Sequence, residues 1–234
     1  MAGDRGWWPI AGIVLGLVGL NVVQNRVVSP GFYVPVAVAA AVALLAFARI
    51  VDGCSWDQLG LARRHVGRGL VWGAVLAGVV VAVYLVGLTL PSTRDLFRDD
   101  RVRDWTIAQS LVAALVRVPL GTVLVEEVAF RGVLPAVLGV RTRRWVAVGA
   151  SAGLFGLWHL LPALGIGRVN PVAQDSVASH GMWVAVLAAV VSTAAVGVWF
   201  WWLRHRARSL LAPMALHWAT NGLGYLFAAY AWRH

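Results

Sequence analysis

The sequence predicts an all-α polytopic membrane protein, a transmembrane helical bundle of about seven spans, or eight if its longest apolar run is divided. Three observations predict this fold class. The 234 residues are 60% hydrophobic and 13% charged, with a mean hydropathy of +0.75, far from the composition of soluble domains. Apolar runs recur at about the 20 residues that a helix needs to cross a bilayer. They lack the strict alternation of barrel strands, and backbone groups in lipid must be satisfied within a segment.

Seven apolar runs follow one another along the chain. They cover about residues 7–23, 32–50, 69–90, 106–138, 145–166, 182–203 and 210–230. The first run lacks a basic n-region and a small-residue cleavage pattern, so we expect a retained span and not a signal peptide. Residues 51–68 are polar and can hold a short interfacial helix but not a span. Residues 91–104 are rich in Arg and Asp and must lie in water or among lipid headgroups.

The fourth run, residues 106–138, is longer than one perpendicular crossing requires and shorter than two comfortable crossings. It contains Arg117, Pro119 and Gly121. Because proline removes an intrahelical hydrogen bond, we expect one long helix kinked near Pro119, with two shorter helices as the alternative.

We expect a single integral membrane domain over residues 1–234. Residues 1–105 contribute accessory spans, and residues 106–230 form the core helices, because the intramembrane polar residues described next all fall in the second part. The single cysteine, Cys54, excludes an intramolecular disulfide.

The charge pattern indicates lipid contacts. The formal net charge is +10 and all twenty basic residues are Arg, in short clusters between the apolar runs, where they are typical of topology signals and headgroup contacts. Membrane lipid is therefore an expected partner, and nucleic acid is not. The Arg distribution favours a cytoplasmic N-terminus. The all-Arg, Ala- and Val-rich composition is typical of GC-rich bacteria, so we expect the bacterial inner membrane.

The only two Glu residues of the chain, Glu126 and Glu127, lie in the fourth run together with Arg131. Inserting such a charge near the bilayer centre costs about 2.5 to 3.5 kcal/mol, so a structural or functional role is expected for each of the three. Glu127 and Arg131 are four residues apart on one helical face, in the favourable order for an ion pair. Glu126 lies about 100° around the helix and is left without a local cation. The three charges could hold helices together, but an unpaired carboxylate in the membrane is a candidate general base.

Two later runs add imidazole and amide groups. His159 lies in the fifth run, and His217 and Asn221 lie four residues apart on one face of the seventh. Each histidine alone is typical of packing or of a helix–helix hydrogen bond. Together with Glu126 they lie roughly 10 to 20 Å from the same membrane face if there are seven spans. We therefore expect these side chains to converge on one water-filled cavity.

These groups suit the hydrolysis of a peptide bond. A carboxylate and an imidazole can hold and deprotonate a water, while a second imidazole and an amide can donate hydrogen bonds to a developing oxyanion. Neither a Gly-x-Ser-x-Gly nor a His-Glu-x-x-His motif is present. A zinc or other divalent metal site on Glu126, His159 and His217 stays open, since residue types do not distinguish it from a glutamate base.

Three motifs on three predicted helices resemble the CPBP family, which comprises the type II CAAX prenyl endopeptidases and the bacteriocin-processing intramembrane proteases. The resemblance covers about residues 106–226. The motifs are Glu126-Glu127-x-x-Phe130-Arg131-Gly132, Phe155-x-x-x-His159 and His217-x-x-x-Asn221.

The resemblance implies an intramembrane endopeptidase that cleaves a membrane-associated peptide or protein. It implies that Glu126, assisted by His159, activates water and that Glu127 with Arg131 organises the site. It also implies that His217 and Asn221 stabilise the oxyanion. Family members have been described both as metalloproteases and as glutamate-dependent proteases, and we favour the chemistry that requires no metal.

Two other function classes share these features. A non-catalytic immunity or partner-binding membrane protein could retain the same scaffold and polar cluster. A proton-coupled transporter also uses intramembrane Glu and His, but it would usually show paired or inverted repeats, and the sequence shows none.

Overall fold

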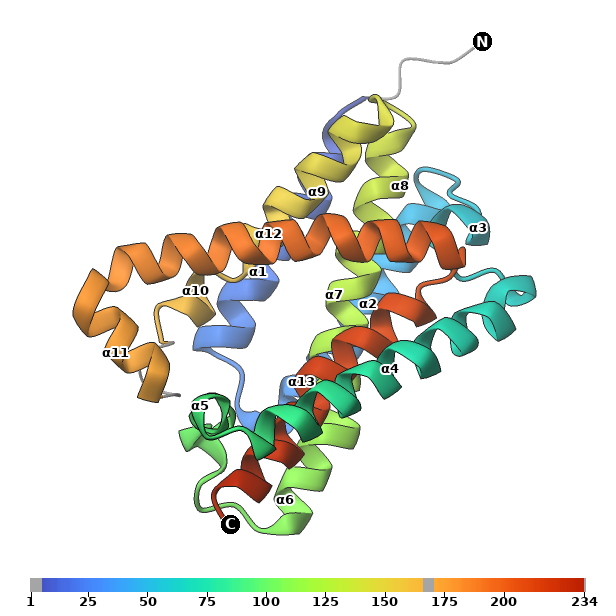
Figure 1. Ribbon diagram of the computed structural model, residues 1–234. Helices are drawn as coiled ribbons and strands as arrows, with labels where there is room; N and C mark the ends of the chain where they lie inside the picture. Colours follow the sequence, from blue (N-terminus) through green and yellow to red (C-terminus); the bar gives the residue numbers. More distant parts are fainter. Residues whose placement is uncertain (1–5, 166–170, 234) are drawn as a thin grey trace.

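The computed structural model describes residues 6–165 and 171–233, and in these ranges it contains helices, turns and short connections but no strand (Figure 1). Six described helical segments are long and apolar enough to cross a membrane, and they match the first six predicted runs. They are Trp8–Arg26, Pro30–Ile50, Arg63–Thr89, Ile107–Gly139, Arg144–Ala163 and Met182–Ala207. The predicted all-α, polytopic bundle is confirmed.

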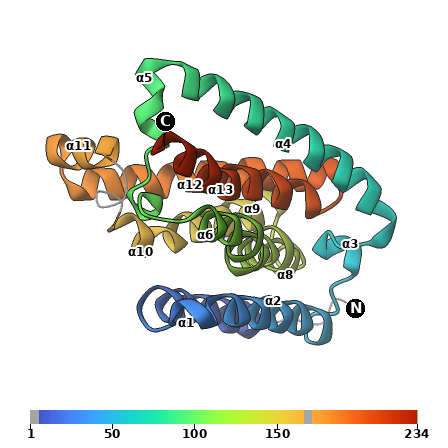
Figure 2. The same ribbon diagram turned by 90° about the horizontal axis from the view of Figure 1, so that it is seen from below.

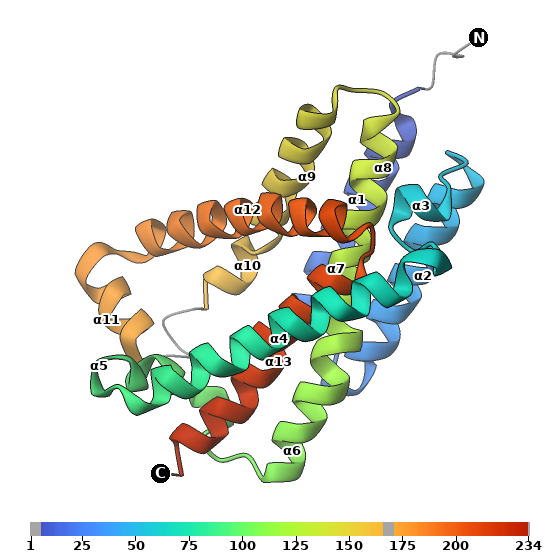
Figure 3. The ribbon, with the colours of Figure 1, turned by 45° about the vertical axis from the view of Figure 1, so that its right-hand side comes forward.

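The seventh predicted run forms α13 (Leu211–Ala231), which is 21 residues long but less apolar than the other six. Its polar side chains include His217, Thr220 and Asn221. In Figures 1 and 3, α13 runs beside α4 (Val66–Thr89), and it also contacts the central helix of the bundle. Helix α13, which carries His217 and Asn221, thus packs against apolar helices.

The N-terminal part alternates long helices with short ones. Its elements are α1 (Trp8–Arg26), η1 (Pro30–Phe32), α2 (Tyr33–Ile50), α3 (Trp56–Leu59), η2 (Arg63–His65), α4 (Val66–Thr89), α5 (Pro91–Arg94), η3 (Asp95–Phe97) and η4 (Asp100–Val102). A capping box between Ser55 and Gln58 starts α3, and Gly60 ends it in the left-handed conformation at φ 77°. The polar segment 51–68 therefore holds a short helix, as expected.

The fourth run is one continuous helical segment, Ile107–Gly139, so the alternative of two separate helices is wrong. Its successive elements are α6 (Ile107–Val112), η5 (Ala113–Val123), α7 (Leu124–Glu127), η6 (Val128–Val133) and α8 (Leu134–Gly139). Both η5 and η6 are π-helical, and η5 contains Pro119. The proline is accommodated within a stretch of wider turns. Wider turns also change which residues share a face, on both sides of Glu126 and Glu127.

The C-terminal part adds α9 (Arg144–Trp158), α10 (Leu160–Ala163), α11 (Pro171–His180) and α12 (Met182–Ala207) before α13. His159 lies at the junction between α9 and α10. The fifth run is therefore not one uninterrupted helix, and a candidate site residue occupies its break.

The helices form layers, which can be followed in Figure 2. Helices α1 and α2 lie on one side and α4 lies on the other, with the fourth run, α9, α12 and α13 between them. Close approach of α4 and α13 depends on small residues: a Cβ added to Gly73 would lie 2.7 Å from the Cβ of Ala215. Small residues at this contact let the two backbones pack tightly. This contact holds α13 against the core.

Candidate active site

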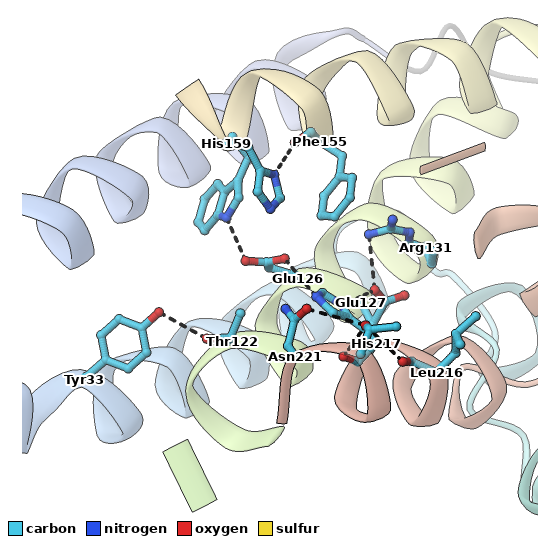
Figure 4. Close-up of polar contacts among 12 residues, drawn as sticks. Tyr33, Thr122, Glu126, Glu127, Arg131, Phe155, His159, Leu216, His217 and Asn221 are labelled. Atoms are coloured by element: carbon cyan, nitrogen blue, oxygen red, sulfur yellow. Dashed lines mark hydrogen bonds and ion pairs between the residues drawn. The ribbon is translucent and has the colours of Figure 1, made fainter. Parts of the chain in front are cut away.

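The six predicted site residues come from three parts of the fold and face a common region (Figure 4). The fourth run supplies Glu126, Glu127 and Arg131, the end of α9 supplies His159, and α13 supplies His217 and Asn221. Figure 4 shows the side chains pointing toward one another between these helices. The three runs bring these side chains together as predicted, and the water-filled cavity between them stays a prediction.

The predicted ion pair between Glu127 and Arg131 is confirmed. Arg131 Nη1 lies 3.2 Å from Glu127 Oε1, and both side chains are almost completely buried. The guanidinium also lies over the ring of Phe155, with its Cζ 3.7 Å from the ring centroid, and 5.0 Å from that of Phe200. One carboxylate and two aromatic faces therefore compensate the buried cation.

His217 lies between the two glutamates. Its Nδ1 is 2.8 Å from Glu127 Oε1, a hydrogen bond, and its Nε2 is 3.8 Å from Glu126 Oε2. The imidazole is buried, and the rings of Phe155 and Phe200 contact it edge-on. The bond to Glu127 fixes the ring orientation, so that Nε2 faces the Glu126 carboxylate.

Glu126 has one engaged and one unengaged oxygen. Its Oε1 accepts a hydrogen bond of 2.9 Å from the indole Nε1 of Trp158. Its Oε2 is buried and has no hydrogen-bond partner among the described residues. A buried carboxylate oxygen is costly to leave unsatisfied, so this atom is the place where a water or a substrate group is expected.

His159 and Asn221 lie at the more accessible edge of the cluster. The Nδ1 of His159 is 2.9 Å from the carbonyl oxygen of Phe155, which leaves Nε2 free of that bond. His159 is partly buried, and Asn221 is exposed, with its Oδ1 accepting from the Thr220 hydroxyl at 3.4 Å. Accessibility thus increases from Glu127 outward to Asn221, which makes this edge the open side of the site.

Comparison with protein-family models identifies the class to which this site belongs. The model described as Type II CAAX prenyl endopeptidase Rce1-like matches residues 108–223, a stretch that contains all six candidate residues. The chain belongs to this family. No curated protein and no solved structure gave a significant match.

Family membership implies the activity of an intramembrane protease, and with its apolar helices the chain is a multi-pass membrane protein. The matched stretch begins in α6 and ends in α13, so it includes every helix that contributes a side chain to the site. Helices α1, α2 and α4 precede it and pack against it from two sides.

The sequence did not identify all the partners of the site in this family member. Trp158 is not among the six predicted site residues, yet its indole donates a hydrogen bond to Glu126 directly. Glu126 does lack a cation on its own helix, but it is not without partners, because Trp158 and His217 reach it from other helices. One signal was available: Trp158 lies inside an apolar run, whereas most Trp residues lie near the ends of runs. Phe200 carried no such signal.

The sequence left open a zinc or other divalent metal site on Glu126, His159 and His217. Among the described residues, no three His, Cys, Asp or Glu side chains are grouped so that they could hold a metal ion. The hydrogen bonds of Glu126, His159 and His217 use Oε1 of the carboxylate and Nδ1 of each imidazole, so they do not engage Oε2 or the two Nε2 atoms. Whether a metal takes part stays a prediction.

Proposed function

We propose that the chain is an endopeptidase that hydrolyses a peptide bond in a membrane-associated peptide or protein, with Glu126 as the general base. One observation carries the proposal: the buried Oε2 of Glu126 has no hydrogen-bond partner among the described residues and lies 3.8 Å from His217 Nε2. A carboxylate held by one oxygen and open at the other is suited to binding and deprotonating a water.

The first step is the attack of water on the carbonyl carbon of the scissile bond. Glu126 Oε2 and the free nitrogen of His159 hold the water, and Glu126 takes one of its protons as the new carbon–oxygen bond forms. The carbonyl π electrons move to the oxygen and produce a tetrahedral oxyanion. Collapse of this intermediate breaks the carbon–nitrogen bond, and the proton on Glu126 passes to the departing amine.

The oxyanion needs donors, and His217 Nε2 with the Asn221 side-chain amide can supply them. Nδ1 of His217 faces the Glu127 carboxylate and needs a proton to donate to it. For Nε2 to donate to the oxyanion as well, both ring nitrogens must carry a proton. With His217 protonated, the charges of Glu126, Glu127, Arg131 and His217 sum to zero. The ion pair between Glu127 and Arg131 thus acts as the support that orients His217.

The open edge of the site constrains the substrate class. His159 and Asn221 are the most accessible of the six residues, so a peptide enters along α9 and α13 at the level of the membrane-spanning helices. A membrane-anchored peptide or regulator, or a leader peptide in the bacterial inner membrane, fits this entry. No metal or organic cofactor is required by this mechanism.

The test uses the full chain expressed in bacterial membranes. New peptide N-termini are mapped by mass spectrometry in cells that produce the wild type or Glu126→Gln. Ser192→Ala is the control, since this hydroxyl on α12 donates a hydrogen bond to a carbonyl of its own helix. We expect cleavage products in the wild type and the control that are absent with Glu126→Gln. Identical products in all three would contradict the proposal, and a biological effect that Glu126→Gln retains would favour a partner-binding function.

A further inference from the structure

A cavity lies apart from the candidate active site, where α3, the end of α8, the start of α9 and the end of α12 meet. Its volume is about 270 Å³. Small apolar side chains of α8 and α9 form much of its wall, and its polar side chains are Gln58, Arg144 and Arg204. No carboxylate lines it, and none of the six candidate catalytic residues does. The cavity therefore has two cationic side chains and no anionic one.

Arg204 is held in the wall of this cavity by backbone groups. Its Nη2 donates to the carbonyl oxygens of Asp57 and Gln58, which belong to α3. Its Nε is buried and has no hydrogen-bond partner among the described residues. The Asp57 carboxylate acts on Arg204 electrostatically but forms its ion pair with Arg64, at 2.7 Å.

Arg144 reaches the same cavity from the start of α9. Its guanidinium Cζ lies 4.7 Å from the ring centroid of Trp201, which also lines the cavity. No ion pair joins it to a carboxylate in the described part of the chain. The two arginines are thus positioned by an aromatic ring and by carbonyl groups, and neither forms an ion pair with a carboxylate in residues 6–165 and 171–233.

We propose that this cavity binds the phosphate group of an anionic phospholipid. The cavity lies at helix ends: one apolar helical segment stops at Gly139, the next begins at Arg144, and a third ends at Ala207, three residues after Arg204. Lipid phosphates lie at the level of such ends, and guanidinium groups bind phosphate through paired, charge-assisted hydrogen bonds. The apolar wall accepts the glycerol and upper acyl carbons. A phosphate would also supply the counter-ion that two adjacent arginines need.

The experiment measures lipid binding and needs no protease activity. Purified full-length protein in neutral detergent is titrated with dioleoyl phosphatidylglycerol or dioleoyl phosphatidylcholine, and bound lipid is counted by native mass spectrometry. Arg144→Gln is compared with Arg143→Gln, which removes the same charge from an exposed neighbour outside the cavity. We expect roughly tenfold weaker phosphatidylglycerol binding for Arg144→Gln and less than about twofold for Arg143→Gln. Equal effects of the two variants would overturn the proposal.

A second variant keeps the charge and fills the space. Gly139 lines the cavity, and a Cβ added there meets nothing within 4 Å, so Gly139→Leu enters open space. Size exclusion and thermal unfolding check that each variant folds. We expect weaker phosphatidylglycerol binding with unchanged net charge, and retained binding in Gly139→Leu would overturn the proposal. Inorganic phosphate in large excess is the last arm: displacement of the lipid by phosphate alone would assign the cavity to free phosphate instead.

Discussion

The indole N–H of Trp158 donates a hydrogen bond of 2.9 Å to Glu126 Oε1, across 32 residues of sequence. This bond joins the last residue of α9 to the helix that carries the carboxylate. The neighbouring residue, His159, faces the same carboxylate (Figure 4). One helix end therefore both orients the proposed base and supplies an imidazole beside it. Trp158 is a positioning residue for Glu126, and this relationship leads to the first prediction.

Trp158→Phe keeps an aromatic ring and removes the donor. Hydrogen bonds to charged groups contribute about 1.5 to 3 kcal/mol, so we expect kcat to fall by roughly 10- to 100-fold while KM changes little. The measurement is steady-state cleavage of a substrate identified by N-terminal mapping. Trp232→Phe is the control, since it removes an indole hydrogen bond of 2.9 Å to the Asp99 carbonyl, away from the site. An equal loss in both variants would show that Trp158 is merely structural.

Asn221→Ala removes a proposed oxyanion donor. The side chain is exposed and bonds only the Thr220 hydroxyl among the described residues, so stability should change little. We expect kcat to fall by roughly 100- to 1000-fold, the usual effect of losing one such donor. Asn25→Ala is the control. It removes a hydrogen bond from a side-chain amide to the Asn21 carbonyl within α1 and should leave the rate unchanged. Wild-type kcat in Asn221→Ala would remove this residue from the mechanism.

Arg131→Met leaves the buried carboxylate of Glu127 without its cation. Removing one partner of a buried ion pair costs about 3 to 5 kcal/mol, so we expect a large loss of stability in reversible unfolding. The double variant Glu127→Gln, Arg131→Met removes both charges and should recover part of that stability. Unchanged stability of Arg131→Met would contradict the structural role of the pair.

Gly73→Ala tests the contact between α4 and α13. The new methyl group would lie 2.7 Å from the Cβ of Ala215, so the helices must separate, at a cost of about 1 to 3 kcal/mol. Gly78→Ala on the same helix meets nothing within 4 Å and should be neutral or stabilising by up to about 1 kcal/mol. Thermal unfolding of the two variants gives the comparison. Equal stability of both would contradict close packing of the two helices at Gly73.

Chelation tests whether the proposed reaction proceeds without a metal ion. Protein dialysed against EDTA should cleave its substrate at the rate of the untreated protein, because Glu126 supplies the base and His217 with Asn221 the oxyanion donors. Loss of activity on chelation, restored by added zinc, would instead show a metalloprotease.

Local patterns were sufficient for part of the site. The ion pair between Glu127 and Arg131 follows from their spacing of four residues on one helix, and the structure contains it. One continuous helix over the fourth run was also predicted, with two helices as the alternative, whereas the π-helical turns around Pro119 were not predicted. The break at His159 does have a local signal, because Pro162 has no backbone N–H to donate to the carbonyl of Trp158, which instead accepts from the Asn21 side chain.

By itself, the sequence determined the membrane-embedded helical class, the position of its apolar runs and the family, because these depend on composition, period and short motifs. Only the tertiary structure decided the partners of Glu126. Trp158 and His217 reach it from α9 and α13, and their approach depends on how three helices pack, which no spacing along one helix specifies. The same holds for Arg144 and Arg204: separated by 60 residues, they line one cavity only because the ends of α9 and α12 meet.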